Sequence, residues 1–289
     1  MIRRGIGVQP YTVGATPFVG LLDTYTNAAA AYSVRLLRSA YTGSAIRVRR
    51  SSDNTEQDIG FDGNGNLNEN ALTTFVGANN GFVTTFYDQS GNSRNATQTT
   101  AANQPQIVSS GSVILENGKP SLQFDGSNDF FNTGNKLLQL NTTVAAAFDF
   151  TRENVSGTLI GQWSSNTTGR TLLLTNQNSQ GVAQSNILLF FNSTATVNNN
   201  IVAPSGMNLI FWNIATGSNN YQVFNNGDNE YNTTITSIAT NVNTAIGRMS
   251  EATSATFFDG VLSELIFWGS IQSSRTGIET NINTYYGIY

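Results

Sequence analysis

The chain has 289 residues, of which 39% are hydrophobic and only 11% are charged, and its formal net charge is -4. Such a mildly acidic chain lacks the clustered Lys and Arg residues that bind phosphate backbones, which argues against a nucleic-acid partner. It contains no Cys and no His, which excludes thiolate chemistry, a Ser-His-Asp triad and the usual zinc ligands, so that no metal and no cofactor are predicted.

The first 20 residues are expected to form an extended arm without a core of its own. They contain Pro10, Pro17 and several glycines but no periodic pattern of apolar residues. They lack the continuous apolar stretch of a signal peptide, and no run in the chain approaches the roughly 18 apolar residues of a membrane-spanning helix. We therefore expect a chain that is made in the host cytoplasm without a signal peptide and that has no membrane span.

Residues 23–43 have the composition of a long helix. The four alanines at 28–31 favour a helix, Asp23 or Thr24 can cap its start, and Gly43 can end it. The sequence therefore predicts a helix near the start of the chain.

Two shorter elements are predicted next. Residues 45–52 should form a half-exposed strand, because apolar residues alternate with arginines there. Residues 68–77 should form a short helix, with Asn68 as its N-cap and Gly77 at its end.

From Gly81 onward the pattern is mainly one of short strands separated by polar turns. Asn-Gly pairs within 116–119 and 225–228 are typical of hairpins. A closing helix is predicted near the C-terminus, where Ile278 and Ile282 recur at helical spacing with Tyr285. Strands are expected at 81–88, 121–126, 143–150, 157–164, 170–176, 186–193, 208–215, 221–227, 244–249 and 260–269.

This series of short strands indicates an all-β fold, namely a two-sheet jelly-roll sandwich of the concanavalin or laminin-G type. The abundance of Gly, Asn, Thr and Ser fits such a fold, whereas disorder would require a higher net charge and fewer aromatic residues. No change of composition marks a second domain, so we predict one lectin-like domain at 21–289 that follows an arm at 1–20.

Four stretches carry a resemblance to known proteins: residues 28–59, 82–98, 117–126 and 255–268. Together they resemble the β-sandwich catalytic domain of the family 54 α-L-arabinofuranosidases. They are also similar to the lectin-like sandwiches of bacteriophage virion proteins. The resemblance extends over roughly residues 22–289 and implies the sandwich fold, but a sandwich hosts many unrelated activities.

The catalytic carboxylates implied by the arabinofuranosidase resemblance do not have evident counterparts here. A retaining glycosidase needs two carboxyl groups about 5–5.5 Å apart. The resemblance places the nucleophile, a Glu, after a strand in the middle of the domain, which corresponds to residues 186–200. The sequence holds no Asp or Glu between Glu153 and Asp228.

The acid/base of the resembled family is an Asp that closely follows an Ile-Gly pair. Here Ile246 and Gly247 are followed by Arg248 and Met249, and Glu251 is the nearest acid. The family's adjacent cysteine pair is also missing. The sequence therefore predicts no catalytic residues and a protein that is not an enzyme.

On these grounds we expect a structural or adhesion protein of a bacteriophage particle: a head decoration protein, a head fibre or a tail-associated protein. Residues 1–20 would then dock it to the particle. Its expected partners are other virion proteins and copies of itself in a homo-oligomer, and its expected location is the virion surface.

Two alternatives remain open. One is a carbohydrate-binding module that recognises glycans on the host surface. The other is an arabinofuranosidase-like glycoside hydrolase with relocated carboxylates, for which Glu251, Asp228 and Glu264 are the candidates.

Three residues are candidates for sugar binding: Asp88, Asn92 and Trp163. The structural interpretation of Asp88 is an Asx-type turn, closed by hydrogen bonds from backbone N–H groups of the next residues. Asp125 and Asp259 repeat the pattern of aromatic residue, Asp and Gly, and are interpreted as turn residues in the same way. Trp163 stands where a predicted strand gives way to a loop, whereas the other tryptophans are expected to pack in the core.

Overall fold

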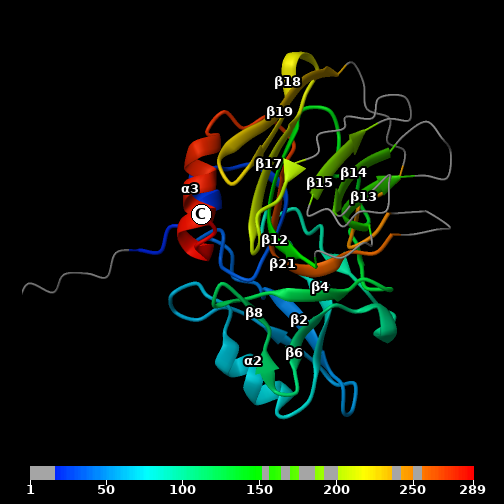
Figure 1. Cartoon of the computed structure of the whole chain (residues 1–289). Helices are drawn as coiled ribbons and strands as arrows, with labels where there is room; N and C mark the ends of the chain where they lie inside the picture. The colour runs from blue at the N-terminus through cyan, green and yellow to red at the C-terminus, as the bar shows by residue number, and fades with distance from the viewer. Residues whose placement is uncertain are drawn as a thin grey trace, which may run out of the picture.

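Two antiparallel sheets face each other in the computed structural model (Figure 1), which describes residues 17–151, 156–163, 170–175, 186–191, 201–235, 242–249 and 256–289. The fold is an all-β sandwich with few helices, as predicted. Most of the predicted arm, residues 1–16, lies outside the described residues.

The first sheet contains, in spatial order, β19 (Asp228–Ile235), β18 (Gly217–Asn225), β17 (Asn208–Ile214), β12 (Thr142–Phe150) and β21 (Asp259–Trp268), with β1 (Ala28–Ser33) and β10 (Leu122–Asp125) beside β21. β1 and β10 share one edge of β21. β10 pairs with the first half of β21, and β1 pairs with its second half. β21 therefore has neighbours on both sides along its length.

The second sheet contains, in spatial order, β16 (Ile201–Val202), β15 (Asn186–Phe191), β14 (Arg170–Thr175), β13 (Gly157–Trp163), β20 (Ala245–Ile246), β11 (Phe131–Asn132), β5 (Ala96–Thr97), β4 (Gly81–Phe86), β2 (Ile46–Arg50) and β3 (Glu56–Ile59). Smaller elements are β6 (Gln106–Ser109), β7 (Ser112–Val113), β8 (Leu115–Glu116), β9 (Lys119–Pro120) and a 3-10 turn at Ala101–Asn103. β6 pairs with both β4 and β10 and so connects the two sheets.

Aromatic side chains fill the space between the sheets. Tyr32 on β1 lies 5.7 Å, between ring centroids, from Phe86 on β4. Phe124 on β10 packs edge-on against Phe131 on β11 and against Phe258. All five rings are fully buried, and each buried aromatic side chain contributes a large apolar area to the core.

The long helix predicted at 23–43 is wrong. The helix here is α1 (Leu21–Thr24), four residues long, and the alanines belong to strand β1, which pairs with β21. Asn27 adopts a left-handed conformation (φ 62°) between the two elements. The strand is buried almost throughout, so pairing and packing outweigh the helix propensity of Ala.

The other two helices are confirmed. α2 (Glu69–Val76) has the Asn68 side chain as its cap, which accepts a hydrogen bond from the Ala71 backbone N–H at 3.0 Å. α3 (Arg275–Tyr286) packs Ile278 and Ile282 inward, and Tyr286 rather than Tyr285 is its fully buried aromatic residue.

The two Asn-Gly hairpins are also confirmed. Asn117 and Gly118 connect β8 to β9, and Asn226 and Gly227 connect β18 to β19. All four residues have positive φ, which is what the tight hairpin turns require. Trp212 and Trp268 are fully buried, as predicted for core residues.

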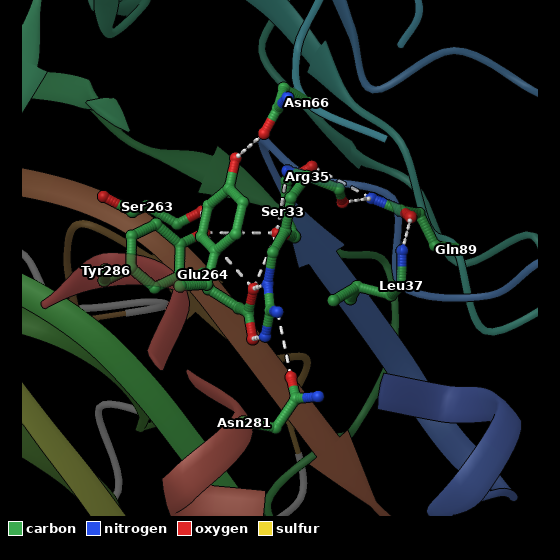
Figure 2. Close-up of polar contacts among 10 residues, drawn as sticks. Ser33, Arg35, Leu37, Asn66, Gln89, Ser263, Glu264, Asn281 and Tyr286 are labelled. Carbon is green, nitrogen blue, oxygen red and sulfur yellow. Dashed lines mark hydrogen bonds and ion pairs between the residues drawn. The ribbon is translucent and has the colours of Figure 1, made fainter. Parts of the chain in front are cut away.

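A buried ion pair joins β1, β21 and α3 (Figure 2). Arg35, just after β1, donates from Nε and Nη2 to the Glu264 carboxylate on β21, at 2.7 and 2.9 Å. The same carboxylate accepts hydrogen bonds from the hydroxyl groups of Ser33 and Tyr286. Arg35 Nη1 donates to the Asn281 side chain on α3 at 2.9 Å.

Both charges of this pair are compensated inside the protein. Burial alone would lower the pKa of the Arg35 guanidinium, but the adjacent Glu264 carboxylate raises that pKa above its usual value. The Glu264 side chain has no solvent-exposed surface, and that of Arg35 is 9% exposed. Loss of one partner would therefore leave an unpaired buried charge, which strongly destabilises the folded state.

We expect Arg35→Leu to lower the free energy of unfolding by about 3–5 kcal/mol, because Glu264 would remain buried and unpaired. The double variant Arg35→Leu/Glu264→Leu should lose less than the single variant. Urea denaturation at pH 7 measures both. Arg47→Leu is the matched control, since the Arg47–Asp58 pair is over 40% exposed and should contribute about 1 kcal/mol or less. Equal losses in the single and double variants would contradict the prediction.

Candidate functional site

Two aspartates oppose each other where β10 meets the start of β21. Asp125 and Asp259 are direct cross-strand partners in the antiparallel register. Directly opposed residues have Cβ atoms about 4.5–5.5 Å apart, and like charges in such positions are destabilising. An arrangement that costs stability in this way is typical of functional sites.

A third aspartate, Asp129, contacts the backbone of Asp125. The loop after Asp125 turns back so that Asp129 Oδ2 accepts a hydrogen bond from the Asp125 backbone N–H at 3.1 Å. Asp125 Oδ1 in turn accepts from the backbone N–H groups of Ser127 and Asn128. This is the Asx-type turn predicted for Asp125, and it fixes the two carboxyl groups relative to each other.

Asp129 has the chemistry of a proton donor. The residue is only 7% exposed, and burial, together with the negative charge of Asp125, raises the pKa of its carboxyl group to about 7. A carboxylic acid with such a pKa carries a proton near neutral pH, as a general acid must.

A cavity of about 320 Å³ opens beside Asp259. Its wall includes Glu116, Asp149, Thr151 and Asp259. Asp259 Oδ1 accepts a hydrogen bond from the Thr151 hydroxyl at 3.0 Å, so Asp259 is not the local turn residue that its sequence motif predicted. The carboxylates of β10, β12 and β21 thus gather at one end of the first sheet.

The acidic end adjoins the Ile-Gly segment at which the arabinofuranosidase resemblance places its acid/base. The backbone carbonyl oxygen of Asp129 lies 2.8 Å from the point where a Cβ on Gly247 would stand, so only glycine fits there. The guanidinium carbon of Arg248 lies 3.6 Å from the centroid of the Phe130 ring. Burial lowers the pKa of Arg248.

Two of the predicted sugar-binding residues, Asp88 and Asn92, form hydrogen bonds with the protein backbone. Asp88 Oδ1 accepts from the backbone N–H groups of Ala31 and Ser90, at 2.9 and 2.8 Å, so the predicted Asx turn is present. Asn92 Nδ2 donates to the carbonyl oxygens of Ala28 and Ala29. Both side chains therefore anchor β1 to this loop, and their role in ligand binding stays a prediction.

Among the described residues, Trp163, Glu264 and Asp228 lie on three different strands, β13, β21 and β19. Trp163 is half-buried at the end of β13, far along the chain from Asp88. Glu264 lies in the buried ion pair, which leaves no surface for a substrate, and Asp228 is exposed in the β18–β19 hairpin. Glu251 lies outside the described residues.

The sequence reasoning missed Asp129. The available signal was the pair of acids four residues apart in "FDGSNDF", which an Asx turn brings together. The opposition of Asp125 to Asp259 depends on strand register and has no local signal in the sequence.

Residues 22–119 match the sequence model of the α-L-arabinofuranosidase B catalytic family. The fold is similar to an arabinofuranosidase complexed with arabinofuranosyl-α-1,2-xylobiose (TM-score 0.69, 16% identity, 88% of this chain and 62% of the other). It is also similar to a GH54 α-L-arabinofuranosidase soaked with a cyclic sulfate inhibitor (TM-score 0.68, 13% identity, 88% and 62%). The chain thus spans less than two thirds of the length of these proteins. No curated protein sequence matches the chain.

These matches overturn the expectation of a non-enzymatic virion protein. Both the family model and the similar structures are those of glycoside hydrolases. The expectation rested on the order of acids along the chain, which does not tell which acids the fold brings together. The expected virion surface location, virion partners and homo-oligomer stay predictions. Within the described ranges, no helix is long and apolar enough to cross a membrane.

The raised pKa of Asp129 predicts how stability depends on pH. The folded protein holds this proton more tightly than the unfolded chain, whose carboxyl titrates near 3.8, so the free energy of unfolding should fall as the pH rises from about 4 through about 7. The Asp129→Asn variant has no carboxyl group to ionise at this position, so its free energy of unfolding should not fall over this pH range. At pH 8 it should be more stable than the wild type by on the order of 2 kcal/mol. Urea denaturation at pH 5 and pH 8 measures the difference. A variant with the same pH dependence as the wild type would refute the assignment.

Proposed function

We propose that the protein is a glycoside hydrolase that releases α-L-arabinofuranosyl groups. The observation that carries this proposal is the match of residues 22–119 to the arabinofuranosidase catalytic family. The similarity of the sandwich to arabinofuranosidase structures over 88% of the chain supports it at the level of the fold. The acidic end of the first sheet supplies the carboxylates that the reaction requires.

Asp259 is the proposed nucleophile. It borders the cavity, and the Thr151 hydroxyl holds one of its carboxylate oxygens. Its half-buried carboxyl group can attack the anomeric carbon of a sugar seated in the cavity.

Asp129 is the proposed general acid and base, because burial and then the negative charge of Asp125 raise the pKa of its carboxyl group. Asp125 is the direct cross-strand partner of Asp259, and its backbone N–H donates to the Asp129 carboxyl group, which ties the proposed acid to the strand beside the nucleophile. In the first step Asp129 gives its proton to the leaving-group oxygen as Asp259 forms the glycosyl ester. In the second step it takes a proton from the water that hydrolyses the ester.

The two roles predict different losses on two substrates. Asp259→Asn should lower kcat about 10³-fold or more on both 4-nitrophenyl α-L-arabinofuranoside and arabinofuranosyl-α-1,2-xylobiose. Asp129→Asn should reduce cleavage of the second substrate by about 10²–10⁴-fold, because its sugar leaving group needs a proton. The same Asp129→Asn variant should have a much smaller effect on the rate at which the nitrophenyl substrate forms the glycosyl-enzyme. Stopped-flow release of nitrophenolate and chromatography of the sugars measure these effects.

Asp228→Asn is the matched control, because Asp228 is an exposed acid in a distant hairpin and should leave both rates unchanged. Wild-type protein that hydrolyses neither substrate at high concentration would refute the proposed function. Full activity in Asp259→Asn and Asp129→Asn would refute only the assignment of the residues.

The pH profile follows from the protonation of Asp129. We expect kcat/KM for arabinofuranosyl-α-1,2-xylobiose to fall as the pH rises above about 7, since the general acid is then ionised. Initial rates from pH 4 to pH 9 measure this limb. Asp125→Asn should shift the limb to lower pH, because it removes the negative charge that raises the pKa of Asp129. A limb that does not move in this variant would contradict the coupling.

A further inference from the structure

A second cavity lies beside α3, remote from the acidic end. Its volume is about 670 Å³, and its wall includes Tyr25, Arg35, Thr276, Thr280, Asn281 and Tyr285. Glu264, which pairs with Arg35 at this cavity, lies five positions after Asp259 on β21, so the two places are about 16 Å apart along the strand.

One face of α3 lines this cavity with hydroxyl groups. Thr276, Thr280 and Thr284 follow one another at intervals of four residues, which places them on the same side of the helix. Gly277 lies between them, and the Tyr25 hydroxyl occupies the place where its Cβ would stand. The tyrosine can therefore lie close against the helix and form part of the wall.

The floor of the cavity is polar but electrically compensated. The Arg35 side chain is nine-tenths buried, and its charge is cancelled by the bidentate contact with Glu264 behind it (Figure 2). Arg35 Nη1 also holds the Asn281 side-chain oxygen. A neutral ligand with many hydroxyl groups suits such a surface better than an anion does.

A third cavity continues this surface on the other side of Tyr285. It has a volume of about 330 Å³, and Asn66, Asn68, Glu69 and Lys119 contribute to its wall. Tyr285 borders both cavities. The two hollows therefore adjoin at one aromatic residue.

Tyr285 is held firmly at this junction. The Arg35 guanidinium lies 4.8 Å and the Lys119 ammonium 4.3 Å from the centroid of its ring. Its hydroxyl donates to Asn66 Oδ1 at 2.9 Å. A prearranged aromatic residue with amide and hydroxyl groups on both sides loses little side-chain entropy when a ligand binds.

We infer that the two cavities together form a binding site for an uncharged oligosaccharide, separate from the proposed catalytic carboxylates. Sugar hydroxyls would pair with the threonine hydroxyls, the Asn281 and Asn66 side chains and Glu69. The apolar faces of the sugar rings would lie against Tyr25 and the edge of Tyr285. The site would hold a polysaccharide chain while another part of that chain is cleaved.

Xylotetraose, cellotetraose and mannotetraose are suitable probes, because they carry no arabinofuranosyl group and would not be consumed by the proposed reaction. NMR titration of the wild-type protein should shift the backbone amide signals of Thr276, Thr280 and Asn66 with at least one of them, with a Kd of roughly 1 mM. Thr280→Arg should weaken this binding at least tenfold, because the long side chain fills the cavity. Thr99→Arg, at an exposed threonine outside the cavity, is the matched control and should bind as the wild type does.

Three outcomes would overturn the inference: no response to any of the three sugars at about 10 mM, shifts confined to Asp125 and Asp259, or equal binding by Thr280→Arg. Inorganic phosphate tests the competing ligand class. Phosphate that produces the Thr276 and Thr280 shifts where the sugars do not would show an anion site instead. Because binding is read without hydrolysis, its failure is distinguishable from a failure of the proposed activity.

Discussion

The buried contact between Arg35 and Glu264 is the constraint on which the rest of the structure depends. It fixes the end of β1 against the middle of β21, and through Asn281 and Tyr286 it fixes α3 against both. A buried ion pair is not in itself a strong source of stability, since desolvation offsets much of the attraction. Its contribution is to specificity, because a packing that separated Arg35 from Glu264 would leave a buried charge unpaired.

A fixed β21 makes the acidic end possible. Asp259 begins this strand and lies directly opposite Asp125, which costs stability wherever both carboxylates are ionised. β12 on one side and β1 on the other hold β21 in register, so the repulsion cannot be relieved by sliding the strand. The raised pKa of Asp129 favours its neutral form, and the hydrogen bonds from Ser127 and Asn128 stabilise the Asp125 carboxylate. The repulsion between Asp125 and Asp259 is thus tolerated because the pairing of β21 with β1 and β12 holds the strand in place.

Local chemistry decided how much the sequence revealed. The Asn-Gly hairpins at 116–119 and 225–228 and the Asn68 cap could be predicted, because each depends on a few neighbouring residues. The alanines of β1 led to the wrong prediction of a helix, because their place in the sheet is set by β21, more than 200 residues further along the chain. The opposition of Asp125 and Asp259 is hidden for the same reason, and the raised pKa of Asp129 arises only once the fold buries it.

The family match and the proposed chemistry occupy different parts of the chain. Residues 22–119 contain β1, β2, β4 and the Asp88 loop, all of which build the sandwich, but none of the proposed catalytic acids. Asp125 and Asp129 follow the matched segment, and Asp259 lies near the other end of the sequence. A scaffold can therefore be retained while the carboxylates move, provided that the new positions face a cavity and one of them keeps its proton. Here Asp259 on β21 faces the cavity, and the loop between Asp125 and Asp129 buries the acid that keeps its proton.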